Sequence, residues 1–107
     1  MSQTCIYFLQ LEHGKIFVGA SQDPVKAMEE HREGLGPLWT RIHRPLDILK
    51  RVPFQREEDL DRYVKSAMRG YGIENVRGGS YSDARIKDSD RHALHAEMHG
   101  DSDCVVA

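Results

Sequence analysis

The segment CIYFLQLEHGKIFVG, residues 5–19, constrains the fold more than any other part of the chain. Residues 4–11 are apolar and β-favouring on both faces, which is typical of a strand inside a sheet. Residues 12–15 have turn chemistry, and residues 16–18 resume the strand pattern. The segment therefore predicts a β-hairpin whose neighbouring strands carry Tyr7 and Phe17.

A helix and a third strand are predicted next. Asp23 is a good N-cap residue and Pro24 suits the first helical position, so a helix begins there and runs to about His31 or Arg32. Glycines at positions 34 and 36 end it. A loop containing Trp39 then leads to a predicted strand over residues 45–52.

The strongest periodic signal indicates a second helix. Its apolar residues recur at i, i+3, i+4, i+7 and i+8, the stripe of an amphipathic helix, and they are Leu60, Tyr63, Val64, Ala67 and Met68. We expect Trp39 and Tyr63 to pack in the core. Residues 75–81 are predicted to form a glycine-rich turn, and the polar, acidic tail has one possible short helix over residues 89–99.

These elements predict an α+β fold, with the order β-β-α-β-α followed by a tail. A small three-stranded antiparallel sheet flanked by helices accounts for that order. The expected division is a single domain over residues 1–82 and a C-terminal tail over residues 83–107, since 107 residues suit one domain.

Composition narrows the cellular setting and the partners. The net charge of −2 provides no global positive field, so any basic footprint for nucleic acid must be local. Cys5 and Cys104 do not make a disulfide framework, which favours a reducing compartment. The sequence shows neither a signal-peptide pattern nor an apolar run of roughly 18 residues. We therefore expect an intracellular protein, cytoplasmic or nuclear, without a membrane partner.

In order and spacing, these landmarks resemble the GIY-YIG nuclease family. The similarity covers residues 4–82 and includes a segment close to one found in many short viral and microbial members. The motifs that carry it are Cys5-Ile6-Tyr7, Phe17-Val18-Gly19, Asp23-Pro24, His31, Trp39-Thr40 with Pro45, and the segment YGIENVRGGSY over residues 71–81.

The resemblance implies a GIY-YIG fold and cleavage of DNA or RNA phosphodiesters with one divalent metal, Mg²⁺ or Mn²⁺. Such chemistry uses metal and electrostatic stabilisation of the transition state. Tyr7 and His31 match catalytic positions of the family. Three other positions are replaced: Phe17 lacks the second tyrosine's hydroxyl, Ala27 stands for the arginine, and Ser66 stands for the metal-binding glutamate.

The replacements predict a catalytically degenerate domain that acts as a nucleic-acid-binding or protein-interaction module and needs no cofactor. The alternative is a divergent, metal-dependent endonuclease that uses Tyr7, His31 and a relocated carboxylate such as Asp59. Arg62 lies one helical turn from Asp59 and would contact a phosphate. The same two residues also suit a solvated ion pair at helical spacing.

The basic residues of the chain suggest where nucleic acid binds. Between positions 41 and 56 the single acid is Asp47, and the candidate phosphate contacts there are Arg41, Arg44, Lys50 and Arg51. The other interpretation is a solvated positive face. Arg77, followed by Gly78-Gly79-Ser80, suits either an anion-binding loop or a turn that needs positive φ.

The tail offers one more candidate site. His92, His95 and His99 share one face of the possible helix, and Cys104 follows. Imidazoles in this arrangement suit zinc, copper or nickel, whereas a solvated tail without metal is the other interpretation.

Overall fold

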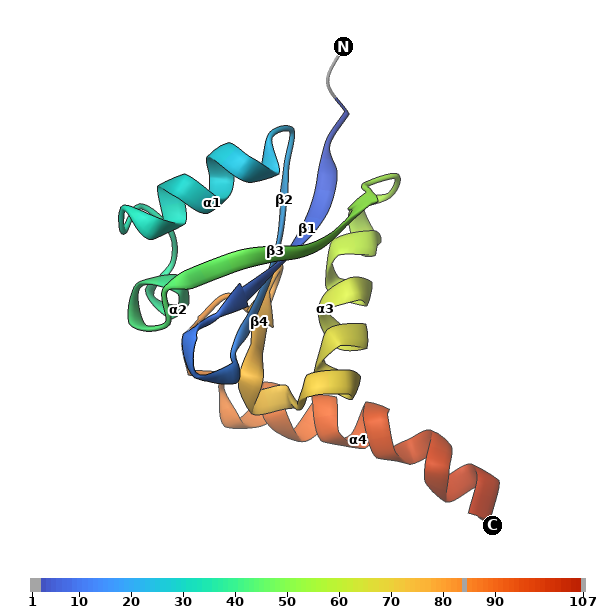
Figure 1. Ribbon diagram of the computed structural model, residues 1–107. Coiled ribbons are helices and arrows are strands. Elements are labelled where there is room, and N and C mark those ends of the chain that lie inside the picture. The colour runs from blue at the N-terminus through green and yellow to red at the C-terminus, as the bar shows by residue number, and fades with distance from the viewer. Residues whose placement is uncertain (1–2, 84, 107) are drawn as a thin grey trace.

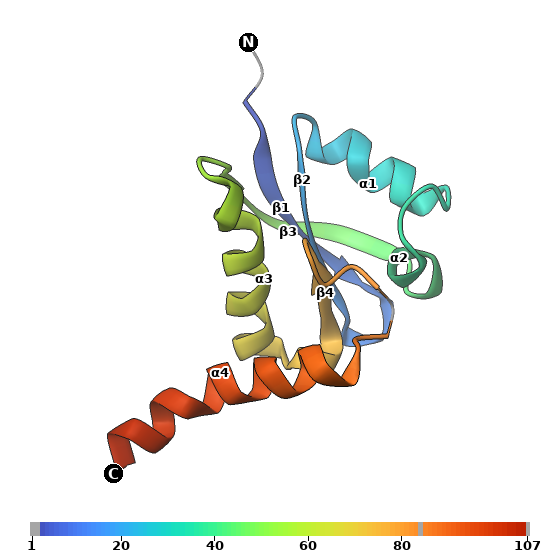
Figure 2. The same cartoon turned by 180° about the vertical axis from the view of Figure 1, so that it is seen from behind.

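A computed structural model describes residues 3–83 and 85–106, and for residues 98–106 the backbone alone. It is an α+β fold built on one four-stranded sheet with the order β3-β1-β2-β4. The strands are β1 (Cys5–Leu11), β2 (Ile16–Ser21), β3 (Pro45–Pro53) and β4 (Val76–Gly78), and the helices are α1 (Pro24–Arg32), α2 (Leu38–Ile42), α3 (Glu57–Tyr71) and α4 (Asp88–Val106). Figures 1 and 2 show α1 and α2 on one side of the sheet and α3 on the other.

The predicted hairpin and first helix are confirmed. Strands β1 and β2 pair antiparallel, with Tyr7 opposite Gly19 and Leu9 opposite Phe17. At the start of α1 the Asp23 side chain accepts a hydrogen bond from the backbone N–H of Lys26, at 3.2 Å. Both elements depend on contacts between residues close in sequence, which is why local pattern predicts them.

The predicted three-stranded antiparallel sheet is wrong, because the sheet has four strands and is mixed. Strand β4 pairs parallel to β2 within the segment expected to be a turn. A strand of three residues is too short to show a period-two pattern. Gly78 permits the pairing, since a Cβ atom there would overlap the carbonyl oxygen of Val18. The turn itself begins at Gly79, with φ of 52°.

The sheet separates two hydrophobic clusters. Successive strand residues point to opposite faces, so Ile6 and Phe8 pack beneath α3 while Tyr7 and Leu9 pack beneath α1 and α2. The predicted stripe of α3 faces the first cluster, where Val64 and Met68 are buried. The side of the sheet on which a residue lies therefore decides which functional groups it can meet.

Helices α2 and α4 contain more helical residues than the sequence predicted. A short helix, α2, lies where a loop was expected, and its Trp39 is buried, with Nε1 donating to the carbonyl of Ile16 at 3.0 Å. Helix α4 is longer than the expected 89–99 segment. Ile86 and Leu94 from the expected tail are buried in the cluster beneath α3, so this part of the tail packs against the domain. Among the described residues, no helix is long and apolar enough to cross a membrane.

Candidate functional site

A cavity of about 260 Å³ lies between the β1–β2 hairpin and α1. Tyr7, Ala27 and His31 line it, so three positions singled out from the sequence come together. The ring of Phe17 lies beside them, with its centroid 4.9 Å from that of His31 and 6.3 Å from that of Tyr7. We call this the Tyr7 pocket.

A directed chain of hydrogen bonds fixes the protons in the Tyr7 pocket. The Thr40 hydroxyl donates to the carbonyl of Pro37 at 3.1 Å, so its oxygen must accept from Nδ1–H of His31 at 3.0 Å. That tautomer leaves Nε2 of His31 as an acceptor, and the Tyr7 hydroxyl donates to it at 3.0 Å. The chain therefore holds Tyr7 as a phenol and His31 as a neutral imidazole.

The electrostatics of the pocket agree with this assignment. Burial, reinforced by the charge of Glu30, raises the pKa of Tyr7 to about 12. Burial lowers the pKa of His31, and Glu30 opposes that shift. At neutral pH the phenol keeps its proton, and the lone pair of Nε2 of the neutral imidazole accepts from the Tyr7 hydroxyl, so neither group is free to take a proton from water.

Two glycines allow the groups to approach this closely. Gly19 faces Tyr7 across the hairpin, and a Cβ atom there would lie 2.6 Å from the Tyr7 hydroxyl oxygen. Gly36 follows α1, and a Cβ atom there would overlap Nδ1 of His31. Neither glycine has positive φ, so it is the missing side chain that matters at both positions.

The charge of the Tyr7 pocket is unsuited to a phosphate. Among the described residues that line it, Glu30 is the one acid and there is no lysine or arginine. Sequence reasoning missed Glu30, although it directly precedes His31. It lies one helical turn from Ala27, at the i+3 spacing that brings helix residues together.

Asp59 does not fit the role of a relocated metal ligand. It is 3% exposed and caps the start of α3, where its carboxylate accepts hydrogen bonds from the backbone N–H groups of Gln55 and Arg56. It also pairs with Arg62 at 2.8 Å, as the ion-pair interpretation expects, although the carboxylate is buried rather than solvated. Its oxygens are therefore already engaged.

The described residues do not fit the divalent ion that the family resemblance implies. Magnesium and manganese prefer several oxygen ligands, and Mg²⁺ keeps an octahedral shell. Within the described part of the chain no group of three or more histidine, cysteine, aspartate or glutamate side chains is placed to hold a metal. Of the tail residues, His92 and His95 are exposed on α4, and the side chains of His99 and Cys104 lie outside the described part.

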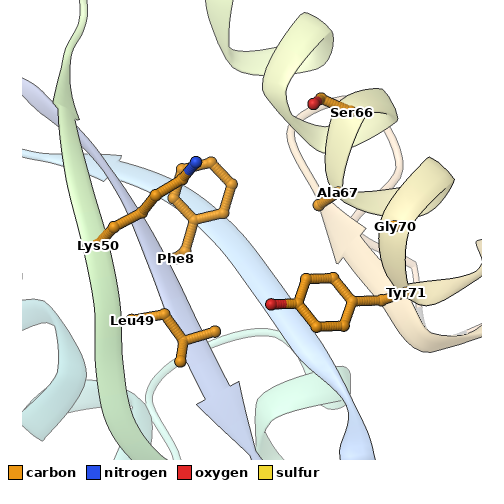
Figure 3. A pocket seen from close by; sticks show the side chains of 7 residues that line it. All are labelled: Phe8, Leu49, Lys50, Ser66, Ala67, Gly70 and Tyr71. Atoms are coloured by element: carbon orange, nitrogen blue, oxygen red, sulfur yellow. The ribbon is translucent and has the colours of Figure 1, made fainter.

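Ser66 lies on the other side of the sheet from Tyr7. It lines a cleft of about 350 Å³ between β3 and α3 together with Phe8 (Figure 3), and Phe8 belongs to the cluster beneath α3. The position that matches the family's glutamate is therefore not brought to Tyr7.

The structure divides the predicted basic segment between several surfaces. Lys50 pairs with Phe8 and places Nζ 4.7 Å from the centroid of its ring, on the α3 side. Arg51 pairs with Tyr7 and so belongs to the opposite side. Arg41, on α2, and Arg44, before β3, are exposed. The segment is therefore not one continuous patch.

Arg77 does not have the surface position expected of a phosphate contact. It is 2% exposed, and its guanidinium donates to the carbonyls of Ile73 and Val76, both at 2.8 Å. The guanidinium also lies 4.5 Å from the Trp39 ring, and burial lowers the pKa of Arg77. Arg77 therefore ties β4 to its surroundings. Of the predicted turn, Arg77 and Gly78 lie in β4, and the turn is at Gly79, which has positive φ.

Fold and pocket together define an α+β domain with a buried tyrosine–histidine pair beneath its first helix. The chain is similar to a UPF0213 protein from Cupriavidus pinatubonensis (strain JMP 134 / LMG 1197), with 30% identity over 57 residues. The match covers 53% of this chain and 63% of the relative, so the chain spans less than two-thirds of that protein's length. No family model matches the sequence, and no solved structure matches it.

Proposed function

We propose that this chain is a GIY-YIG-like domain that binds nucleic acid and has lost the hydrolytic chemistry of that family. One observation carries the proposal: the Tyr7 pocket retains the Tyr7–His31 pair, but the pair is closed into a neutral hydrogen-bond chain, and the described residues that line the pocket include no lysine or arginine. The α+β fold and the distant similarity to a UPF0213 protein give weak support to the family resemblance.

The loss of chemistry follows from what a phosphodiester needs. Its transition state carries negative charge, and removing one electrostatic donor typically costs roughly 10²–10³ in rate. Here Ala27 offers no donor, Phe17 offers no hydroxyl, and the neighbouring charge is the anionic Glu30. Losing a general acid or base lowers the rate by a further factor of roughly 10²–10⁴, although the effects of such losses within one site do not multiply cleanly.

Cleavage and binding must be measured together on the purified chain. We would incubate it with plasmid, single-stranded DNA and RNA, with Mg²⁺, with Mn²⁺ and with chelator. The expected result is binding that weakens steeply with salt, as phosphate contacts require, with no cleavage in any condition. Binding would be followed by the fluorescence anisotropy of end-labelled strands, in parallel with gels that detect cleavage.

The endonuclease alternative has one observation in its favour, since Tyr7, His31 and the carboxylate of Glu30 share a pocket. Metal-dependent cleavage that both Tyr7→Phe and Glu30→Gln abolish would establish that alternative and overturn the proposal. A domain that binds no nucleic acid would instead be a protein-interaction module. Leu46 and Leu49, both exposed on the edge strand β3, are the residues that favour such a role.

A further inference from the structure

We infer that the face of the sheet opposite Tyr7 binds single-stranded nucleic acid, in a groove between β3 and α3. Three neighbouring depressions of about 310, 350 and 170 Å³ make up this α3 groove: the first lies along α3 itself, the second lies between α3 and strands β1 and β3, and the third lies beside the β1–β2 hairpin. The first and second share Ser66, and the second and third share Leu49 and Tyr71. The inference rests on the proposed binding of nucleic acid and names the surface and the strandedness.

The charge of the α3 groove is one-sided. Its lining includes five cations and, within the described part of the chain, no aspartate or glutamate: Lys15, Lys50, Arg62, Lys65 and Arg69. The chain as a whole has a net charge of −2, so this concentration of positive charge is local. A groove with cations and no lining acid is suited to a polyanion.

Not all five cations are equally available to a phosphate. Arg62 pairs with Asp59, Lys65 pairs with Glu97 at 3.1 Å, and Lys15 donates to the side chain of Asn75 at 2.8 Å. Lys50 and Arg69 are exposed, and the described residues include no acid that pairs with either. We therefore assign the principal phosphate contacts to Lys50 and Arg69.

The central depression of the groove suits an unpaired base. Tyr71 is 52% exposed on α3, and Leu49 is 43% exposed on β3 across from it. Figure 3 shows the Tyr71 ring reaching from the helix toward the strands. Lys50 on β3 extends along the ring of Phe8 on β1. An exposed aromatic ring beside cations is how proteins bind single strands without reading their sequence.

Stacking also explains why a single strand is favoured over a duplex. The base faces of a duplex are covered by their own neighbours, so a base must leave the stack before it can meet Tyr71. From Arg62 to Tyr71 the helix rises about 14 Å at 1.5 Å per residue. At about 3.4 Å per stacked nucleotide this length matches a strand of a few nucleotides.

The two faces differ in the charge that they present to such a strand. The Tyr7 pocket is lined by Glu30 and by no lysine or arginine of the described chain, whereas the α3 groove has the opposite composition. A strand held in the α3 groove lies on the far side of the sheet from Tyr7 and His31. This placement is consistent with binding that does not lead to cleavage.

The test compares neighbouring residues that point to opposite faces. Lys50→Gln and Arg51→Gln remove one cation each from adjacent positions of β3, on the α3 side and the Tyr7 side respectively. Arg69→Gln on α3 is compared with Arg41→Gln on α2, and Tyr71→Ala probes the stacking contact. Anisotropy with labelled single-stranded DNA, single-stranded RNA and duplex DNA is recorded over a salt series, after circular dichroism shows that each variant is folded.

We expect Lys50→Gln and Arg69→Gln each to lower the slope of log K against log salt by about 0.7 for single strands. Tyr71→Ala should weaken binding roughly 5- to 150-fold and leave the slope unchanged, because stacking releases no counterions. Arg51→Gln and Arg41→Gln should bind like the parent chain. The parent chain should bind single strands more tightly than a duplex of the same sequence.

The other outcomes separate the two proposals. In one outcome the parent chain binds nucleic acid in a way that Arg51→Gln or Arg41→Gln weakens, while Lys50→Gln, Arg69→Gln and Tyr71→Ala have no effect. That result would overturn the assignment to the α3 groove and leave the proposed function standing. Equal affinity for duplex and single strand, with Tyr71→Ala neutral, would overturn the single-strand assignment. If the parent chain binds neither DNA nor RNA, the groove and the proposed function both fail.

Discussion

The Tyr7 hydroxyl donates to Nε2 of His31 across 3.0 Å, and both side chains are buried beneath α1. Because Thr40 and Pro37 continue the chain, each proton in it has one defined place. A buried network in which every member is satisfied stabilises a domain, whereas losing one member leaves a buried polar atom without a partner. The pair that resembles catalytic machinery therefore also has a structural role.

Replacing Tyr7 by phenylalanine should destabilise the protein. The ring and its packing against Phe17 remain, but Nε2 of His31 loses its donor inside the core. We expect a loss of about 1–3 kcal/mol in the free energy of unfolding. Urea unfolding followed by circular dichroism measures it, and Tyr71→Phe on the surface is the control, expected to change stability little.

Tyrosine absorbance should show one phenol that ionises late. The chain has four tyrosines, and Tyr7 has its pKa raised to about 12 by burial. In the unfolded chain the same phenol loses its proton near pH 10, so between about pH 10 and 12 the folded state binds more protons and stability falls as pH rises. An ultraviolet titration should contain a late component that Tyr7→Phe removes. A titration without that component would contradict the burial of the phenol.

Stability should also decrease on the acid side because of His31. Its pKa in the folded protein lies below the ordinary value of 6.5, mainly through burial. As pH falls below about 6.5 the unfolded chain binds a proton that the folded chain does not, so the free energy of unfolding decreases until the folded pKa is reached.

The measurement for His31 is the free energy of unfolding at a series of pH values from 7 downward. His31→Gln should lower stability at neutral pH and weaken the dependence of stability on pH, and His92→Gln, at an exposed position on α4, is the control for replacing a histidine. Part of the dependence of the free energy of unfolding on pH should persist in His31→Gln, since burial also lowers the pKa of His43. An unchanged slope in His31→Gln would show that His31 is not the group responsible.

Two glycines should respond oppositely to alanine. At Gly36 a new Cβ would overlap His31, so Gly36→Ala should cost about 1–3 kcal/mol through overpacking. At Gly70, within α3, nothing lies within 4 Å of an added Cβ, so Gly70→Ala should stabilise the helix by about 0.5–1 kcal/mol. The melting temperature should fall in Gly36→Ala and rise in Gly70→Ala. A melting temperature that rises in Gly36→Ala would contradict the close approach of Gly36 to His31.

Much of the fold was predictable from the sequence, because the hairpin, the cap of α1 and the stripe of α3 are set by neighbouring residues. Strand β4 was not predictable, since its three residues gain their structure from β2, which is distant in sequence. Arg77 was misplaced for a related reason. An arginine is usually exposed, and its burial here depends on carbonyls and on a tryptophan ring that only the fold brings to it.

The candidate site was predicted in part. Tyr7, Phe17, Ala27 and His31 do meet, as alternation along the strands and spacing along α1 allow. Ser66 could not be placed from sequence, because which face of the sheet α3 covers depends on how the chain crosses from β3.

Removing the Asp59 carboxylate should weaken the start of α3. Asp59→Ala loses the hydrogen bonds from the N–H groups of Gln55 and Arg56 together with the pairing to Arg62. We expect a cost of about 1–2 kcal/mol in the free energy of unfolding, as for other helix caps. Added Mg²⁺ or Mn²⁺ should leave the stability of the parent chain unchanged, and metal-dependent stabilisation that Asp59→Ala removes would return Asp59 to the role of a ligand.

Restoring the family residues should not restore cleavage. Phe17→Tyr and Ala27→Arg would return a hydroxyl and a cation to the Tyr7 pocket, where both positions already face His31. Ser66→Glu would instead place its carboxylate in the α3 groove beside Phe8, on the other side of the sheet. The triple variant therefore gathers no complete set of groups around one phosphate, and we expect no metal-dependent nicking of plasmid. The same triple variant with Tyr7→Phe is the control. Nicking that requires Ser66→Glu, and that is absent when only Phe17→Tyr and Ala27→Arg are made, would show that position 66 reaches the Tyr7 pocket and would contradict the separation of the two faces.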